Sequence, residues 1–457
     1  MNGGVRGHLE STLPPTSAPA WVSIASGKNP GKHGIYDFIA PTGHIITSKS
    51  VKGDRIWDIL SRENLSCCIV NIPVTYPPLK INGCMISSFL TPPGKVFVHP
   101  PAFSELLEST GYRIGFEFER QKLDPLSGNE RWEILADFYD ILRKRAETAA
   151  RLIELRDWDF FMVNFKEVDD VQHLFWDKKD TLLEFFTTLD GYLAGLCQNF
   201  KNALIISDHG FGPSPIYNFN VNSWLNKEGY LKLRGSAQKV VTGVYSMAYH
   251  LLPQGLQGFI SRFLKREGLK YPPGTDSERT LAYRDRNGIS ITKSATRWEA
   301  IRAEIIEKLL NLTGEDGSRV IALARAREEA FFGPFVPEAP DIVILPHEKY
   351  FLSSYILKDI FSKARSGLAG SHNTAAALHG IFIANGPDTK IDAKIQGARV
   401  YDIAPTVLHI LGLPVPDDMD GQVLREIFRE ESELARREVK YQKVTDEEGQ
   451  VKNKAGN

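Results

Sequence analysis

The chain has 457 residues, which is long for one domain, so a single large core with an inserted subdomain, or two domains, is expected. Its hydrophobic, aromatic and charged fractions of 42%, 10% and 24% are those of an ordinary globular protein. The formal net charge of −1 gives no sign of a nucleic-acid-binding surface, and no apolar stretch is long enough to span a bilayer. The polar start contains no signal peptide, and the four cysteines have neither metal nor disulfide spacing, so a reducing cytoplasm is the expected compartment.

Short apolar runs alternate with helical patterns along most of the chain. Strands are predicted over residues 66–74, 159–165, 202–208, 339–346 and 380–387. Helices are predicted over residues 136–155 and 180–200. Cys67 and Cys68, within the first of these strands, are expected to be buried and inert. This alternation predicts an α/β fold in which a mostly parallel sheet is sandwiched by helices.

The alternation breaks near residue 229, where a basic helical pattern without a strand partner covers residues 237–268. A further helix is predicted over residues 297–312. We therefore expect a mainly helical cap, residues 229–334, inserted between two parts of the core, residues 1–228 and 335–432. Its basic side chains either face an anionic substrate or only solvate a surface. The charged residues 433–457 are expected to form a flexible tail.

Ser17 follows two prolines, at the point where a helix is expected to begin. One interpretation is an N-cap, with Pro19 in the first turn and Gly27 as the helix stop. The other is a nucleophile, because a helix N-terminus favours the negative charge of an alkoxide and of a bound phosphoryl group. The choice between them depends on the rest of the chain.

Two predicted strands end in residues that suit metal coordination. Asp208 and His209 follow one strand directly, and both can bind a cation only if the chain bends at Gly210. Asp169 and His173 follow another strand at i, i+4 spacing, which places both on one side of a helix. The structural alternatives are a turn with a surface histidine and a solvated helical pair. Because sites in open α/β sheets lie at the carboxyl ends of strands, two such pairs favour a metal centre.

His372 and His379 form the third candidate position, since both precede the predicted strand at residues 380–387. One of the two would complete a site with Asp169 and His173. The other would then be an ordinary polar residue.

The chain resembles the alkaline phosphatase superfamily in its type I phosphodiesterase/nucleotide pyrophosphatase branch. The matching segments occur in the family's order and cover most of the chain outside the cap: residues 14–35, the Asp169–His173 pair, residues 207–213, the motif 370–373 with residues 380–387, and residues 401–421. Residues 71–78 and 278–291 also resemble a prokaryotic subgroup of this family. The resemblance implies the superfamily fold and hydrolysis of a phosphodiester or phosphomonoester substrate with two divalent metal ions.

The resemblance also assigns roles by position. Ser17, rather than Thr16, matches the nucleophile because of its spacing to Gly27 and to the His33–Gly34 pair. Asp208 and His209 match ligands of the metal on the nucleophile side. Asp169, His173 and His372 match ligands of the other metal, with His372 preferred over His379. Mixed carboxylate and imidazole ligands favour Zn²⁺ or Mn²⁺, with Mg²⁺ as a further option.

The implied mechanism is in-line attack by the Ser17 hydroxyl, followed by hydrolysis of a phosphoseryl intermediate. A sulfatase is disfavoured. Sulfatases require the motif C/S-x-P-x-R, and in the segment that begins at Ser17 the arginine position is occupied by Trp21. A phosphotransferase or mutase of the same superfamily remains open. So does a binding protein of the same fold that has lost turnover.

One departure from the family concerns the nucleophile-side metal. The family's first strand ends in an aspartate that binds this metal, and residues 3–12 match the segment that normally follows that strand and its first helix. The sequence therefore lacks this strand, which implies either a start further upstream or a natural loss. We expect a gap, or a wide strand spacing, beside the strand that ends at Asp208.

Overall fold

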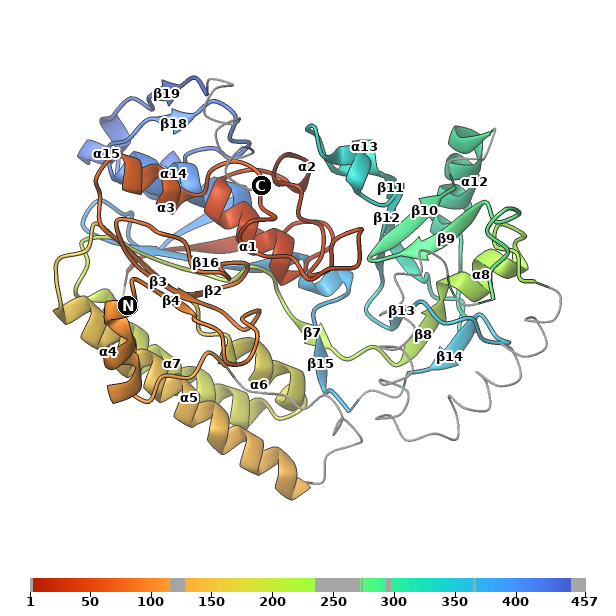
Figure 1. Ribbon diagram of the computed structural model, residues 1–457, viewed down its shortest axis with the longest axis horizontal. Helices are drawn as coiled ribbons and strands as arrows, with labels where there is room; N and C mark the ends of the chain where they lie inside the picture. Colours follow the sequence, from red (N-terminus) through yellow and green to blue (C-terminus); the bar gives the residue numbers. More distant parts are fainter. Residues whose placement is uncertain are drawn as a thin grey trace.

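The computed structural model describes residues 3–115, 128–234, 272, 274–292, 297–364 and 367–444. Figure 1 shows these residues in two parts, a larger one built on two sheets between helices and a smaller one rich in short strands. In the described part of the chain, no helix is long and apolar enough to cross a membrane.

Two four-stranded sheets form the larger part. One has the order β17-β1-β16-β6, with bounds Ala393–Arg399, Val5–Glu10, His379–Asn385 and Ala203–Ile206. The other has the order β4-β3-β2-β5, with bounds Val98–His99, Gly83–Ser87, Cys67–Ile72 and Phe160–Val163. The predicted strands at residues 66–74, 159–165, 202–208 and 380–387 are therefore confirmed.

The direction of the strands corrects the sequence-based prediction. Three pairs are parallel, β1–β17, β2–β3 and β2–β5. Three are antiparallel, β1–β16, β16–β6 and β3–β4. The fold is α/β, but its sheets are mixed, so the prediction of a mostly parallel sheet is wrong for the described strands. Strand–helix–strand alternation predicts only crossover connections, whereas β16 and β17 enter from the distant second part of the chain.

Helices cover the sheets in two layers (Figure 1). One layer contains α1 (Ser17–Ser26), α3 (Ile56–Arg62) and α14 (Ile403–Ile410). The other contains α5 (Gly128–Glu154), α6 (Glu167–Phe175) and α7 (Lys179–Cys197), which confirms the helices predicted at residues 136–155 and 180–200.

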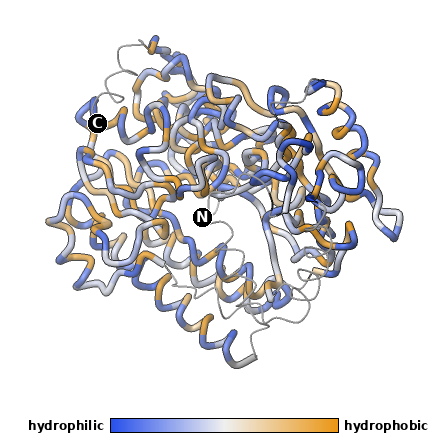
Figure 2. The backbone as a smooth tube through the Cα atoms, turned by 45° about the vertical axis from the view of Figure 1, so that its right-hand side comes forward, coloured by the Kyte–Doolittle hydropathy of each residue, from blue (hydrophilic) through white to orange (hydrophobic). Residues whose placement is uncertain are grey.

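Strand β2 shows how this sandwich is specified. Cys67 and Ile69 pack into the core beneath α1 and α3, whereas Cys68 and Val70 pack into the core on the opposite face. All six residues of β2 are buried, and Cys67–Val70 form a continuous apolar run rather than an alternating one, with Asn71 at the irregularity before Ile72. Figure 2 shows hydrophobic residues recurring through these interior segments, with hydrophilic residues along the outer helices.

The smaller part has its own hydrophobic core and contains more strand than expected. Its two sheets have the orders β11-β12-β10-β9 and β13-β8-β14. The strands are β8 (Tyr217–Asn220), β9 (Ala282–Asp285), β10 (Gly288–Ile291), β11 (Ile321–Ala326), β12 (Ile342–Pro346), β13 (Tyr350–Ser353) and β14 (Phe361–Lys363). The helices are α8 (Val221–Lys227), α12 (Trp298–Leu310) and α13 (Arg327–Ala330).

These strands and helices can be compared with the predicted helical cap, residues 229–334. Helix α12 confirms the helix predicted at residues 297–312, and β12 confirms the strand predicted at residues 339–346. The long helical pattern at residues 237–268 lies outside the described residues. The described remainder is a mixed helix–strand unit rather than a mainly helical one. Its core also includes residues on both sides of 229–334, from Phe219 to Ile356, so the proposed division into domains stays a prediction.

The predicted flexible tail is partly wrong. Residues Glu433–Arg436 form helix α15, and Leu434 is buried in the main core. The Leu434 carbonyl lies 2.8 Å from His409 Nε2 in α14. Strand β19 (Tyr441–Gln442) pairs with β18 (Val415–Pro416). Arg437 also donates to the His409 and Ile410 carbonyls, so several contacts hold this charged segment against the core. Residues 445–457 lie outside the described residues.

The expectation of a gap, or of a wide spacing, beside the strand that ends at Asp208 concerns β6 and its neighbours, and it stays a prediction. Within the residues that the structure describes, β6 pairs only with β16, and β5 pairs only with β2. Both strands therefore have one edge without a ladder partner. All residues of both strands are only half-buried, although each strand is apolar. Phe160 and Met162 of β5 and Leu204 and Ile206 of β6 pack against the same core.

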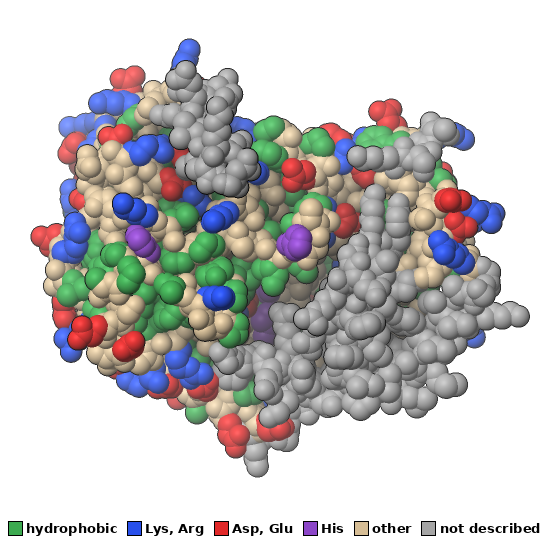
Figure 3. All heavy atoms as spheres, in the orientation of Figure 1, with side chains coloured by type: hydrophobic (Ala, Val, Ile, Leu, Met, Phe, Trp, Pro, Cys, Tyr) green, Lys and Arg blue, Asp and Glu red, His purple; other side chains and the backbone are tan. Residues whose placement is uncertain are grey.

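One face of the sheet β17-β1-β16-β6 is also poorly covered. Ile205 and Ile383 are cross-strand partners, and neither belongs to a core cluster among the described residues. Ile381, two residues before Ile383, is 52% exposed. In Figure 3 apolar side chains gather on the half of the molecule that contains the two larger sheets. Unpaired strand edges beside exposed apolar side chains are typical sites of association.

Replacing Ile381 with threonine is therefore expected to lower hydrophobic-dye binding and self-association of the 457-residue chain. Threonine keeps the β-branched shape, so the free energy of unfolding should change by less than about 0.5 kcal/mol. Dye fluorescence and light scattering measure both effects. The control is Ile391→Thr, since Ile391 is 67% exposed outside the strands. Equal effects of the two substitutions would show that the sheet face is not the associating surface.

His33, the last residue of helix α2 (Pro30–His33), is a buried histidine inside the core. Its Nε2 lies 2.9 Å from Ser23 Oγ in α1, and its Nδ1 accepts a hydrogen bond from the Ile35 N–H. Burial, assisted by the Lys28 ammonium, lowers the pKa of His33 to about 3. His33 is therefore neutral at pH 7 and has a structural role, linking α1 to α2.

This depressed pKa predicts a pH-dependent stability. The unfolded chain binds a proton at His33 below about pH 6.5, whereas the folded chain does not until about pH 3, so stability falls as the pH falls through this window. The loss from His33 should be about 1.4 kcal/mol for each pH unit below 6.5. Urea unfolding at pH 7.5 and 5.5 measures it. The variant His33→Gln should be less stable but show a shallower decline, and an unchanged decline would contradict this origin.

Candidate active site

Ser17 is the first residue of α1, and its side chain points toward a second chain segment. Thr16 occupies the cap position in extended conformation, and no side chain caps this helix. The interpretation of Ser17 as an N-cap is therefore wrong, because the helix begins one residue earlier than a capping role for Ser17 requires. Ser17 Oγ instead lies 3.1 Å from His209 Nε2. Gly27 ends the helix in a left-handed conformation, as predicted.

Asp208 and His209 follow β6 where the chain bends. The Asp208 carbonyl accepts a hydrogen bond from Ser11 Oγ, which ties this bend to the end of β1. His209 Nδ1 lies 2.9 Å from the Gly210 carbonyl, an acceptor, so Nδ1 carries the proton and Nε2 presents its lone pair. Nε2 lies 3.4 Å from Asp208 Oδ2. Asp208 Oδ2 is itself buried without a hydrogen-bond partner among the described residues.

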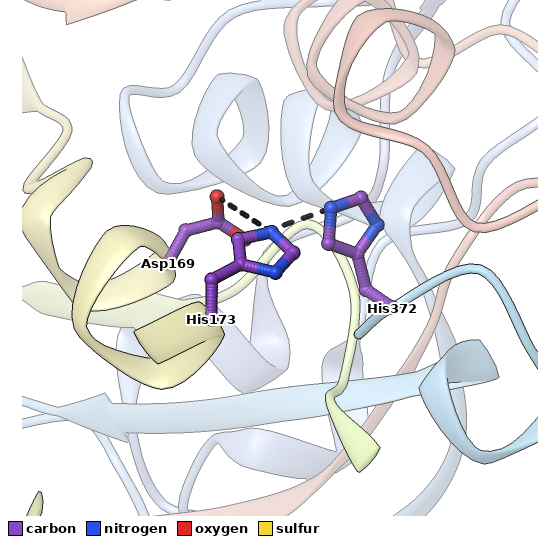
Figure 4. A group of neighbouring side chains, drawn as sticks. All are labelled: Asp169, His173 and His372. Atoms are coloured by element: carbon purple, nitrogen blue, oxygen red, sulfur yellow. Dashed lines mark ion pairs between the residues drawn. The ribbon is translucent and has the colours of Figure 1, made fainter. Parts of the chain in front are cut away.

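Asp169, His173 and His372 form a second group beside the first (Figure 4). Asp169 and His173 come from α6, and His372 faces them from the segment after β15 (Gly370–Ser371). Asp169 Oδ2 lies 3.6 Å from His173 Nε2, and Asp169 Oδ1 lies 3.7 Å from His372 Nε2. One ligand atom from each residue lies within 4.8 Å of the others.

The orientation of His173 is fixed from behind. Its Nδ1 lies 2.9 Å from the Gly370 carbonyl, so the proton is on Nδ1 and the Nε2 lone pair faces Asp169. Gly370 permits this close approach, because a Cβ at that position would lie 2.6 Å from the Gln172 carbonyl oxygen. A backbone carbonyl behind a histidine is the usual support of a metal ligand.

The two groups are contiguous. The His209 and His372 rings stack with centroids 4.1 Å apart, and the His173 and His372 rings lie 5.1 Å apart. The structure therefore brings together Ser17, both histidines of the strand-end motifs and His372. His379 lies elsewhere: it is exposed at the start of β16, with its ring 6.0 Å from that of His8.

The charges of this region favour cation binding at neutral pH. Burial, together with neighbouring His209, lowers the pKa of His372 well below its usual value, so the imidazole is neutral. Burial disfavours the charge of Asp169, but the Lys166 ammonium outweighs it and holds the pKa of this carboxyl well below its usual range. A neutral imidazole and an ionised carboxylate are the forms that bind metal ions.

Lys166 is the site residue that the sequence-based reasoning missed. It immediately precedes α6, and its Nζ donates to Asp169 Oδ2 at 2.8 Å and to Asp170 Oδ1 at 2.5 Å. Although burial opposes its charge, these carboxylates raise the pKa of Lys166. A signal was present, since Lys166 precedes two aspartates at i+3 and i+4, but such charges usually lie on a solvated helix.

Three buried polar atoms in the two groups have no hydrogen-bond partner among the described residues: Asp169 Oδ1, His372 Nδ1 and Asp208 Oδ2. Buried polar atoms are normally satisfied, so an orphaned carboxylate oxygen in each group indicates a missing partner. Divalent cations fit these donors, which are carboxylate oxygens and imidazole nitrogens. Among the described residues, the Asp169 group supplies three ligand residues, whereas the Ser17 group supplies two and a hydroxyl.

The fold thus places a serine at a helix N-terminus beside two adjacent groups of carboxylates and imidazoles. The model of the type I phosphodiesterase/nucleotide pyrophosphatase family matches residues 1–381, and the chain belongs to this family.

Solved structures with the same fold include human ectonucleotide pyrophosphatase/phosphodiesterase 5, with a TM-score of 0.53, 13% identity, and coverage of 94% of this chain and 92% of that one. Phosphonoacetate hydrolase from Sinorhizobium meliloti 1021, in complex with phosphonoformate, has a TM-score of 0.53 and 15% identity, with coverage of 88% of this chain and 86% of that one. An inactive murine form of the first enzyme, in complex with AMP, has a TM-score of 0.53 and 14% identity, with coverage of 94% and 92%.

A curated relative matches over a short stretch. The 2,3-bisphosphoglycerate-independent phosphoglycerate mutase of Bacteroides thetaiotaomicron is 42% identical over 55 residues. This match spans 12% of the chain and only 11% of the mutase.

Proposed function

We propose that this protein is a metal-dependent hydrolase of phosphodiester or phosphomonoester bonds that works through a phosphoseryl intermediate at Ser17. The observation that carries the proposal is the 3.1 Å contact between Ser17 Oγ and His209 Nε2, beside the group of Asp169, His173 and His372. Membership of the family supports the hydrolase class.

The residues divide into two donor sets. Asp208 and His209, with the Ser17 hydroxyl, would hold one divalent cation, and Asp169, His173 and His372 would hold the other, with Zn²⁺ or Mn²⁺ best suited to these ligands. Bound cations would lower the pKa of the serine hydroxyl and offset charge on the phosphoryl oxygens.

Ser17 performs the covalent step. Its Oγ gives up its proton to solvent and forms a bond to phosphorus as the bond from phosphorus to the leaving oxygen breaks, and the leaving oxygen takes up a proton from solvent and departs as an alcohol. Water then cleaves the phosphorus–Oγ bond and restores the serine. The position at the N-terminus of the buried helix α1 supports this role, since backbone N–H groups there favour the negative charge of the phosphoryl group.

The test is hydrolysis of bis(p-nitrophenyl) phosphate and p-nitrophenyl phosphate by metal-stripped protein and by protein reloaded with Zn²⁺ or Mn²⁺. We expect activity only after reloading, and mass spectrometry of the acid-quenched reaction should find a phosphorylated Ser17. Metal-independent hydrolysis, or modification of another residue, would contradict the proposal.

Phosphoryl transfer to an acceptor other than water is the second candidate, favoured by the short match to the phosphoglycerate mutase. Adding glycerol to the assay distinguishes the two: a transferase yields glycerol phosphate in place of inorganic phosphate. If the protein is a binding protein without turnover, metal should bind but neither glycerol phosphate nor inorganic phosphate should form.

We also propose a reducing, cytoplasmic location. Cys68 and Cys84 are directly opposite each other on β2 and β3, and both are fully buried free thiols.

A further inference from the structure

Lys166 has a position that helix stability does not explain. It precedes the first residue of α6, where the partial positive charge of the helix N-terminus disfavours a cation and where no side chain caps the helix. Its side chain is only 20% exposed, and its ammonium lies 5.7 Å from the centre of the Phe89 ring. The ammonium is therefore held inside the site by the two carboxylates it contacts.

Lys166 contacts one carboxylate oxygen of Asp169 and one of Asp170. Asp169 Oδ2 accepts from Lys166, whereas Asp169 Oδ1 is buried without a partner and faces His372 Nε2. Asp170 Oδ1 also accepts from Lys166, and Asp170 is not among the three residues whose ligand atoms converge. Asp169 Oδ1 thus faces His372 without competition, whereas Asp169 Oδ2, 3.6 Å from His173 Nε2, is shared with Lys166. The Asp170 carboxylate is neutralised by the same ammonium.

We propose that Lys166 is a positioning residue that limits this metal site to a single carboxylate, with Asp170 kept out of coordination, and so sets its preference for cations that accept imidazole ligands. The inference rests on the proposed function, because it requires that Asp169, His173 and His372 bind a metal ion. Its physical basis is that Lys166 is a built-in counter-ion between Asp169 and Asp170.

Without this ammonium, two adjacent carboxylates would share one site. Their mutual repulsion would favour a hard divalent cation between them, and carboxylate oxygens suit Mn²⁺ relative to Zn²⁺ better than imidazoles do. Lys166→Met, which keeps the apolar stem and removes the charge, should therefore shift the ratio of the Mn²⁺ to the Zn²⁺ dissociation constants toward Mn²⁺ by at least about tenfold.

The test measures binding of Mn²⁺ to the metal-stripped full-length chain, with Zn²⁺ as competitor. The electron paramagnetic resonance spectrum reports the concentration of free Mn²⁺. The variant His372→Ala identifies which binding event belongs to this group. Asp170→Asn alone should leave the ratio within about twofold of the wild-type ratio, because Asp170 is not a ligand when Lys166 is present. Lys166→Met/Asp170→Asn should restore the wild-type ratio, since it removes both the ammonium and the carboxylate it neutralises.

The outcomes separate this inference from the proposed function. If the wild-type chain binds neither ion at the His372-dependent site, both are overturned. If the wild type binds but Lys166→Met, folded by circular dichroism, leaves the ratio unchanged, only the role of Lys166 is wrong. If Lys166→Met does not fold, the charge-balanced double variant and Asp170→Asn still test the role of Lys166. A changed ratio of the Mn²⁺ and Zn²⁺ dissociation constants in Asp170→Asn would make Asp170 a native ligand and overturn the inference.

Discussion

Replacing Ser17 with alanine is expected to reduce hydrolysis of p-nitrophenyl phosphate by roughly three orders of magnitude or more, because it removes the nucleophile of the proposed covalent step. Metal binding by Asp169, His173 and His372 should persist, since Ser17 contacts His209 and not these residues. Stability should change little, because Ser17 does not cap its helix. Steady-state kinetics, metal content and thermal unfolding measure the three properties.

Thr16 offers a matched control. It is the adjacent hydroxyl, buried, and its Oγ1 has no hydrogen-bond partner among the described residues. Thr16→Val keeps the shape of the side chain and should retain turnover within a few-fold. A Ser17→Thr variant should keep measurable activity, because it retains a hydroxyl at the same position. A Ser17→Ala enzyme as active as the wild type would remove Ser17 from the reaction.

Much of the core follows from local sequence. The strands β2, β5 and β6 are predictable because each contains four consecutive apolar residues, and β2 is buried on both faces. Strand β1 is not, because it alternates with polar residues and contains Gly7. Its partner β16 is supplied by residues near the other end of the chain, and a Cβ at Gly7 would lie 2.6 Å from the Ile395 carbonyl oxygen of β17. Such pairing cannot be inferred from a local pattern.

In the candidate site, too, some residues could be predicted from local sequence and others could not. Asp208 and His209 are visible because they follow an apolar strand closely, and Asp169 and His173 because they lie at i, i+4 spacing in the helix after another one. Lys166 is not, because lysine side chains are usually solvated, and its burial here depends on where α6 lies after β5. Among the described residues β5 and β6 are edge strands, and their apolar residues are half-buried because no described strand pairs with the open edge of either.

Replacing His372 with alanine is expected to weaken Zn²⁺ binding at the Asp169 group by more than about 100-fold and to reduce hydrolysis by a comparable factor. A direct ligand contributes more than the supporting contacts, whose loss typically costs 10- to 100-fold in affinity. His372 is also the residue that links the two groups, since its ring stacks on that of His209. Its loss should weaken the binding event of the Asp169 group far more than the other event, and isothermal titration of metal-stripped protein with Zn²⁺ measures the two separately.

His379 is the matched control for this prediction, because it is a histidine seven residues away on the same segment but exposed and outside the group. His379→Ala should leave both Zn²⁺ affinities and the turnover within about twofold, since an exposed side chain away from the ligands contributes little to either. If His379→Ala weakens Zn²⁺ binding and His372→Ala does not, the ligand assignment is reversed. The half-buried, uncharged His372 imidazole, 3.7 Å from Asp169 Oδ1, would then need another explanation.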